Sequence, residues 1–273
     1  MNHDELVVLG TGNALVKECY NTCFALRGPE GIFLVDTGGG NGILRQLDRA
    51  GIPLADLNHI FITHQHTDHL LGLIWLIRLI TQHHERGLYS GECRIYCHAE
   101  LVQIIEQTVR LLLEEKLARG LGTFIHLIPV ADGERKQIAG YDVTFFDIHS
   151  TKVKQFGFTL LLHDGQKLTC LGDEPFNEDN EAMLKGSDWL LCEAFCLYSE
   201  ADQFKPYEKH HSTVREACQI AQRYEIPHLV LWHTEETHGS QRKRHYTEEG
   251  SRFYNGDLYV PDDLDVIDLS AKP

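Results

Sequence analysis

A single heptapeptide, THQHTDH at residues 63–69, constrains both the fold and the chemistry of this chain. It contains four potential metal ligands, His64, His66, Asp68 and His69. An extended His-x-His pair points both imidazoles to one side, because strand side chains repeat every two residues. A turn after His66 would aim Asp68 and His69 at a second point nearby, and such donors suit zinc. Since the segment directly follows the apolar residues 60–62, it predicts a loop that leaves a buried strand and supplies two metal ions.

Short apolar strands alternate with helical segments along both halves of the chain, with no internal repeat and no low-complexity linker. We expect strands over residues 6–9, 23–26, 31–36, 60–62, 143–146, 157–162, 167–171, 189–191 and 229–231. We expect helices over residues 42–50, 70–81, 99–117 and 213–224. The last of these would begin with a capping box formed by Thr213 and Glu216. The alternation is typical of layered α/β architecture, and residues 1–273 are interpreted as one domain.

Three further polar residues stand directly after apolar strands, namely His149, Asp173 and His233. Taken alone, each fits an ordinary cap or turn residue. Taken together with the 63–69 segment, they complete a ligand set for two metal ions. An aspartate can bridge two cations in such a centre, as two-metal hydrolytic sites require.

With these residues in order, the chain from Leu6 to His233 resembles the metallo-β-lactamase superfamily. The resemblance implies an α/β fold, the four-layer αββα sandwich, with the metals at one edge of its two sheets. It implies that one cation is held by His64, His66 and His149, and the other by Asp68, His69 and His233, with Asp173 bridging them. Asp36 matches the first motif of the superfamily and is expected to orient the ligand loop.

Two further segments resemble the ribonuclease Z-like branch of that superfamily. Residues 191–195, LCEAF, are similar to its HEAT-type segment, although Cys192 stands where the family has a histidine. His211-Ser212-Thr213, which precedes a predicted helix, is similar to its HST segment. The oxygen-reducing branch of the superfamily has a glutamate at the position of His66. The histidine therefore favours hydrolysis over oxygen reduction.

The extra residues make chemical sense for a phosphodiesterase. Cleavage of a phosphodiester releases an alkoxide, which is a poor leaving group unless it is protonated. His211, held by Glu193, is the expected general acid, and Asp68 is expected in the catalytic centre as well as among the ligands. The resemblance implies two zinc ions as cofactors, with manganese as the alternative.

The first hypothesis is a metal-dependent phosphodiesterase that acts on a small or short substrate such as a cyclic nucleotide. The alternatives are a transfer-RNA 3′-processing endonuclease, another hydrolase of the same fold (arylsulfatase, thioesterase or lactonase), and a metal-stabilised binding protein without turnover. Little more than a hairpin separates His149 from Asp173. The resemblance implies a long RNA-clamping arm at this place in members that process transfer RNA, and this chain has no room for one. The net charge of −15 also disfavours long RNA, because phosphate contacts depend on basic surface. The helical stretch 70–119 is expected to cover the site instead.

Other features bear on location and partners. No apolar run approaches the roughly 20 residues of a membrane span, and no secretory signal is visible at the start, so we expect a cytoplasmic protein with no membrane partner.

The eight cysteines are expected to be free and mostly buried thiols. The basic run Arg242-Lys243-Arg244 is expected to be a solvated loop. The resemblance is compatible with a homodimer, although no sequence motif indicates one.

Overall fold

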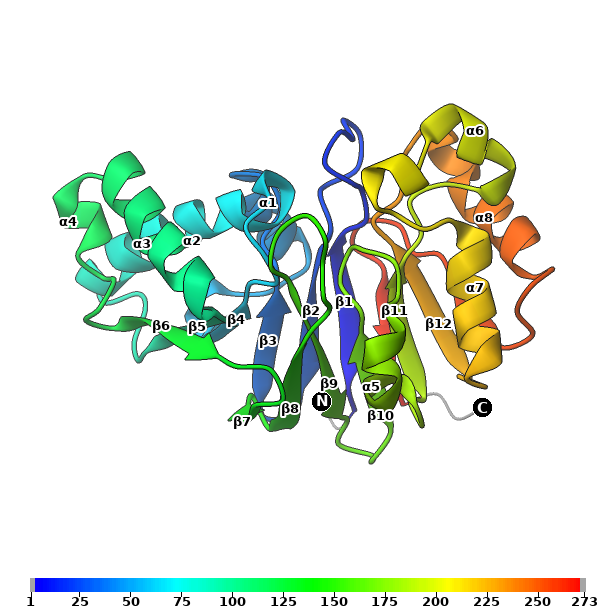
Figure 1. Ribbon diagram of the computed structural model, residues 1–273. Coiled ribbons are helices and arrows are strands. Elements are labelled where there is room, and N and C mark those ends of the chain that lie inside the picture. Colours follow the sequence, from blue (N-terminus) through cyan, green and yellow to red (C-terminus); the bar gives the residue numbers. More distant parts are fainter. Residues whose placement is uncertain (1–2, 271–273) are drawn as a thin grey trace.

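The computed structural model describes residues 3–270 as two seven-stranded mixed sheets packed face to face, with helices outside each (Figure 1). The first sheet has the order β14 (Val266–Asp268), β1 (Glu5–Gly10), β2 (Cys23–Gly28), β3 (Gly31–Val35), β4 (His59–Phe61), β5 (Cys93–His98), β6 (Ile125–Val130). The second has the order β13 (Asp257–Tyr259), β12 (His228–Trp232), β11 (Trp189–Glu193), β10 (Lys167–Cys170), β9 (Phe156–Leu161), β8 (Tyr141–Asp147), β7 (Arg135–Ile138). The predicted αββα sandwich is confirmed.

The helices divide between the two outer faces. Those outside the first sheet are α1 (Gly42–Arg49), α2 (Thr67–Glu85), α3 (Ala99–Leu112) and α4 (Glu115–Ala118). Those on the side of the second sheet are α5 (Glu181–Leu184), α6 (Ala201–Phe204), α7 (Val214–Arg223) and α8 (Arg242–Gly250). Short 3-10 turns are η1 (Leu54–Asp56), η2 (Glu178–Asn180), η3 (Tyr198–Glu200), η4 (Tyr207–Lys209) and η5 (Gly239–Gln241). Among residues 3–270, no helix is long and apolar enough to cross a membrane.

Strand β1 shows why the apolar runs of this sequence become strands buried on both sides. Leu6 and Val8 belong to the core between the sheets, whereas Val7 and Leu9 belong to the core beneath the helices of the first sheet. Because side chains alternate along a strand, a strand covered on both faces needs an unbroken apolar run rather than an alternating one. The inter-sheet core is rich in aromatic rings from both sheets.

Helix α2 extends the sequence prediction at both ends and packs closely on the loop after β3. Its apolar residues recur at helical spacing and are buried, for example Leu73, Ile77 and Ile80. Gly72 is required at the contact, because a Cβ added there would lie 1.9 Å from the carbonyl oxygen of Thr37. The contact fixes the start of α2, which carries part of the 63–69 segment.

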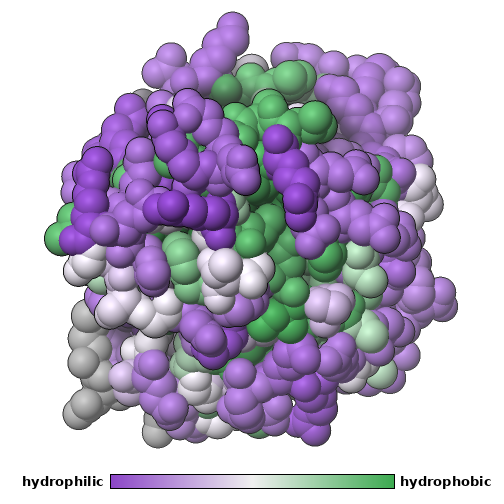
Figure 2. Space-filling model, turned by 90° about the vertical axis from the view of Figure 1, so that its left-hand side faces the viewer, coloured by the Kyte–Doolittle hydropathy of each residue, from purple (hydrophilic) through white to green (hydrophobic). Residues whose placement is uncertain are grey.

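Five strands, β5, β6, β7, β13 and β14, were not predicted from the sequence, and the long helix expected over 99–117 is two helices, α3 and α4. Residues 93–98 and 125–130 pair as parallel strands at the edge of the first sheet. The expectation that residues 70–119 cover the site is therefore wrong, because this stretch, as described, extends and covers the first sheet. None of its residues lines the pocket described below. Figure 2 shows this side of the molecule, where a band of hydrophobic side chains lies between hydrophilic ones.

Candidate active site

The 63–69 segment changes from extended chain to helix in the middle, as its spacing predicts. β4 ends at Phe61, and His66 is the extended N-cap residue of α2, with φ −62° and ψ 149°. Asp68 and His69 consequently lie in the first helical turn, and both are buried. One loop thus presents two imidazoles from extended chain and a second pair of ligands from a helix start.

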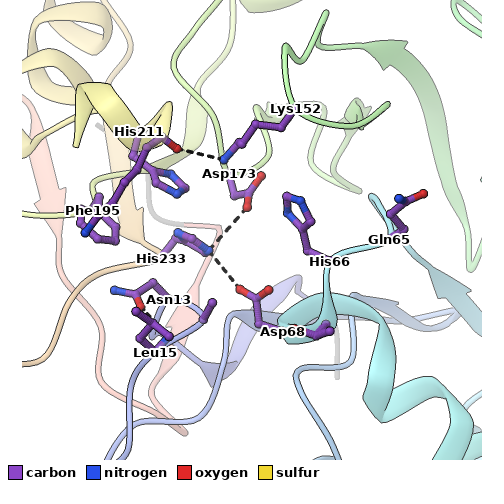
Figure 3. A pocket seen from close by; sticks show the side chains of 13 residues that line it. Asn13, Leu15, Gln65, His66, Asp68, Lys152, Asp173, Phe195, His211 and His233 are labelled. Atoms are coloured by element: carbon purple, nitrogen blue, oxygen red, sulfur yellow. Dashed lines mark hydrogen bonds and ion pairs between the residues drawn. The ribbon is translucent and has the colours of Figure 1, made fainter. Parts of the chain in front are cut away.

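Six of the seven predicted ligands form two neighbouring groups. Donor atoms of His64, His66 and Asp173 lie within 4.8 Å of one another, and so do those of Asp68, His69 and His233. Asp173 directly follows the Gly172 turn after β10, and His233 directly follows β12. The two sheets therefore bring together residues that are far apart in the chain, as Figure 3 shows for His66, Asp68, Asp173 and His233.

Asp173 stands between the two groups. Its Oδ2 atom lies 3.5 Å from Nε2 of His64, 3.4 Å from Nε2 of His69 and 3.5 Å from Nε2 of His233. Asp68 is shared less widely, since its Oδ2 atom lies 3.4 Å from His69 and 3.5 Å from His233. A carboxylate with imidazoles of both groups around one oxygen has the position that a bridging ligand requires.

Buried atoms without hydrogen bonds show that this donor set fits metal ions. Nε2 of His69, Nε2 of His233 and Oδ1 of Asp173 are buried and have no hydrogen-bond partner among residues 3–270. A buried polar atom without a partner is costly, and all three atoms belong to residues of the two neighbouring groups. Coordination of cations would satisfy them, and nitrogen with carboxylate oxygen is the donor chemistry that zinc takes in hydrolases.

The pKa shifts of three of the six residues favour the form that coordinates a metal ion. Burial lowers the pKa of His64 well below its usual value and lowers the pKa of His66, which favours the neutral imidazole that binds a metal ion. Burial opposes ionisation of Asp173, but the surrounding imidazoles outweigh it and hold its pKa well below the usual range. His69 differs, because the nearby Asp36 and Asp68 outweigh its burial and raise its pKa.

Asp36 lies behind the ligand loop, where the sequence analysis expected it. Its carboxylate accepts hydrogen bonds from the Thr63 backbone N–H (2.9 Å) and the Thr63 hydroxyl (2.8 Å). Its Oδ2 atom also lies 2.7 Å from Nδ1 of His69. A partner on Nδ1 fixes the ring orientation and leaves Nε2 for the metal, which is how such outer residues tune metal sites.

His149 is the predicted ligand that the structure leaves outside these groups. Its side chain is exposed, and its backbone has a left-handed φ of 59° just after β8. The backbone N–H is held by Oδ1 of Asp147 at 2.8 Å, and the side chain lines a neighbouring depression with Pro175 and Tyr207. In the described chain His149 joins no cluster of metal-binding donors, so its role as a ligand stays a prediction.

The predicted Glu193 and His211 pair lies beside the ligand groups. Nδ1 of His211 is 3.4 Å from Oε2 of Glu193, which is fully buried and accepts a hydrogen bond from the Ser212 N–H through its other oxygen. The His211 ring stacks on Phe195, with centroids 4.9 Å apart and planes 9° apart, and lies 5.1 Å from the His233 ring. Cys192, beside Glu193, is a core residue packed under the helices of the second sheet.

A pocket of about 420 Å³ opens over this centre (Figure 3). Its walls carry two lysines that the sequence analysis missed, Lys152 and Lys209. Lys152 donates to the Lys209 carbonyl at 3.3 Å, and the Lys209 ammonium lies 5.0 Å from the centre of the Phe195 ring. Their positions depend on loops next to His149 and His211, so residue type and spacing gave no signal for them. The lysines supply positive charge above the metal-binding groups.

Two expectations outside the site have different outcomes. All eight cysteines are free thiols and only Cys19 is not fully buried, as predicted.

The interpretation of residues 242–244 as a solvated loop is wrong, because they begin α8 and Arg242 is buried. Arg242 donates to the Thr234 hydroxyl at 2.6 Å and to Asp262 at 2.9 Å. It therefore stabilises the loop that follows the ligand His233.

Comparison with known proteins agrees with this geometry. The metallo-β-lactamase fold protein YhfI from Bacillus subtilis superposes with a TM-score of 0.78 at 18% identity, covering 97% of this chain and 99% of that one. Human tRNase Z, short form, superposes with a TM-score of 0.72 at 23% identity, covering 98% and 100%. A ribonuclease Z of Thermococcus sibiricus is 27% identical over 98% of this chain and 97% of its own length.

Fold, site and relatives define the class of the protein. It is a metal-dependent hydrolase with the metallo-β-lactamase fold, of the ribonuclease Z-like type. Within that class the chain belongs to the family of the anti-Pycsar protein Apyc1, which matches residues 5–247.

Proposed function

We propose that this protein is a dinuclear metal-dependent phosphodiesterase that acts on a small phosphodiester such as a cyclic nucleotide. The observation that carries the proposal is the Glu193–His211 pair beside six converging metal ligands. Binding of metal alone needs no proton donor at the rim of the centre, whereas departure of an alkoxide does. This pair therefore supports turnover over a purely structural or sensor role.

The residues of the chain divide the reaction between them. When bound, two cations supply Lewis-acid polarisation of the phosphoryl group and a water nucleophile active at neutral pH. The new bond forms between phosphorus and the water oxygen, and the bond to the leaving oxygen breaks. His211 gives its proton to that leaving oxygen, while Glu193 orients the imidazole and stabilises its charged form. Lys152 and Lys209 attract and orient the substrate anion.

Zinc is the cation that we propose for both positions, with manganese as the alternative. Histidine nitrogens make up four of the six gathered ligands, His64, His66, His69 and His233. Imidazole suits zinc, whereas sites built from oxygen ligands alone suit manganese or magnesium. Asp68 and Asp173 provide the oxygen donors, and His149 would complete the first group if its loop turned inward.

The pocket and the loops above it favour a small substrate. A volume of about 420 Å³ falls within the roughly 300–1,000 Å³ of small-molecule sites. Between His149 and Asp173 the chain forms only the hairpin of β9 and β10, packed in the second sheet. The net charge of −15 also disfavours long RNA, whose binding depends on contacts of basic side chains with phosphates.

Transfer-RNA 3′ processing is the second candidate, because a relative matched over 97% of its own length is named ribonuclease Z and human tRNase Z shares the fold. Arylsulfatase, thioesterase and lactonase activities are the remaining alternatives in this fold. A screen with zinc and then manganese separates them, using a cyclic nucleotide, bis(p-nitrophenyl) phosphate, an aryl sulfate, a thioester, a lactone and an unprocessed transfer RNA. We expect turnover of the cyclic nucleotide. Tight binding and a clean 3′ cut of the transfer RNA at physiological salt would favour the second candidate instead.

Location and assembly stay predictions. We propose a cytoplasmic protein, and a homodimer that uses the apolar side chains exposed on α2 and α3. Trp75 and Leu112 line one shallow depression there, and Leu111 is 84% exposed. Exposed apolar patches mark association surfaces when they are contiguous. Light scattering of the purified protein measures the mass directly, and a monomer across the micromolar range would contradict the dimer.

A further inference from the structure

A second cluster of metal-binding side chains lies apart from the active-site pocket, beside α6 and α8 at the upper right of Figure 1. It consists of Glu200, Glu235 and His238, which offer donor atoms within 4.8 Å of one another. Nε2 of His238 lies 2.9 Å and 3.0 Å from the two oxygens of Glu200. The His245 ring lies 4.6 Å from the His238 ring and places a second imidazole at the edge of the cluster.

Glu235 is the buried member of this cluster, and one of its oxygens has no hydrogen-bond partner in the described chain. The residue is only 5% exposed, and its Oε1 atom is buried without a hydrogen-bond partner in the described chain. Its Oε2 atom accepts one hydrogen bond, from the Thr237 N–H at 2.7 Å. Burial of a carboxylate oxygen without a partner lowers the stability of the fold, because the oxygen loses its water and gains no hydrogen bond in return. A cation or a proton donor that reaches the oxygen would remove this cost.

The nearby cationic groups do not meet this need. His238 is already held by both oxygens of Glu200, and Arg242 is committed to Thr234, Pro261 and Asp262. Two carboxylates thus lie beside one imidazole, which carries at most a single positive charge and is paired with Glu200 alone. Imidazole nitrogen and carboxylate oxygen are both donors that zinc takes, and three protein donors leave a fourth position for water.

We propose that Glu200, Glu235 and His238 bind a third divalent cation of the zinc type, separate from the two catalytic ions. Its ligands come from the end of η3, from the loop after His233 and from the residue before η5. A cation there would fasten three segments that otherwise meet through side chains alone.

The position suggests what this cation does. Glu235 follows the catalytic ligand His233 by two residues, and its N–H donates to the carbonyl of Phe195, a residue of the pocket wall. The next residue, Glu236, accepts hydrogen bonds from the N–H groups of Lys17 and Glu18, in the loop beyond the pocket residue Leu15. The cation would therefore brace the wall of the pocket without touching the substrate.

Metal content measured in matched variants tests the proposal. Wild type and Glu235→Gln are saturated with zinc, desalted and analysed by inductively coupled plasma mass spectrometry. We expect wild type to bind one cation per chain more than Glu235→Gln. Glu236→Gln serves as the control, because it removes a neighbouring carboxylate whose partners are backbone amides, and it should keep the wild-type content. His238→Gln and Glu200→Gln, at partly exposed positions, provide the same comparison if Glu235→Gln folds poorly.

A second arm separates this site from the catalytic centre. In an Asp173→Ala background, which impairs the dinuclear site, addition of His238→Gln should lower the zinc content by one further ion per chain. Zinc should also raise the thermal midpoint of the Asp173→Ala protein by more than that of the double variant, since a ligand that binds only the folded state stabilises it. Equal metal content and equal thermal response with and without Glu235 and His238 would overturn the proposal, whatever the fate of the phosphodiesterase assignment.

Discussion

Replacement of His211 by alanine is the sharpest probe of the proposed mechanism. The imidazole is held between Glu193, at 3.4 Å from its Nδ1 atom, and the ring of Phe195, stacked at 4.9 Å. The substitution removes the proton donor but leaves the six gathered metal ligands intact. Because His211 borders the pocket and is 9% exposed, its loss opens space toward solvent instead of creating a sealed cavity.

The expected loss follows from the role of a general acid. Positioned proton transfer contributes roughly 10²–10⁴-fold to rate, which corresponds to about 2.7–5.4 kcal/mol of transition-state stabilisation. The full loss applies to a diester whose leaving group is an alkoxide. A p-nitrophenyl diester should lose much less, since its leaving group scarcely needs a proton. Glu193→Gln should show the same pattern more mildly, because Glu193 orients the imidazole without donating the proton.

The assay compares kcat for the two substrates in wild type and both variants, with metal content measured on the same samples. Glu193, His211 and His233 also lie close enough together to hold a metal, so a ligand role is the competing explanation. Loss of a ligand would lower metal content and impair both substrates alike. Equal loss on both substrates with intact metals would show that His211 binds the substrate and would refute its role as the acid.

The other predictions concern the metals and the fold. Asp173→Ala should lose at least one metal and most activity, because one carboxylate faces both ligand groups; full activity with the wild-type metal content would contradict the assignment. Asp36→Asn should weaken metal affinity by roughly 10–100-fold, measured by competition with a chelator, because the amide no longer holds His69 in the same way. Gly72→Ala should destabilise the protein by about 3 kcal/mol, since its Cβ would meet the Thr37 carbonyl oxygen at 1.9 Å; an unchanged urea midpoint would refute that contact.

The local part of the site could be predicted from the sequence. Residues 63–69 carry their own geometry, because an extended His-x-His followed by a helix start leaves little choice about where the side chains point. The same holds for Glu216, which accepts the Thr213 N–H at 3.0 Å as a capping box requires. In both cases the interacting groups are neighbours in the chain, so spacing alone places them.

Predictions failed where contacts join distant segments. Lys152 and Lys209 meet over the pocket only because two loops converge, and Arg242 is buried because Asp262 and Thr234 receive it. The direction of the His149 side chain likewise depends on a left-handed turn that residue type does not encode. Strands β5 and β6 were missed because their burial depends on α3 and on the core between the sheets, to which Tyr96 and Val130 belong.

The core between the sheets sets the geometry of the metal centre. Phe61 lies three residues before His64, and Phe158 pairs with Cys170, which lies three residues before Asp173. The two rings meet edge to face, with centroids 5.9 Å apart and planes at 88°. Edge-to-face pairs have a preferred separation, so this contact helps to set the distance between the strand that leads into residues 63–69 and the strand that leads to Asp173, the predicted bridging ligand. The aromatic residues of the core thus position ligands from two sheets that do not share a hydrogen-bonded strand.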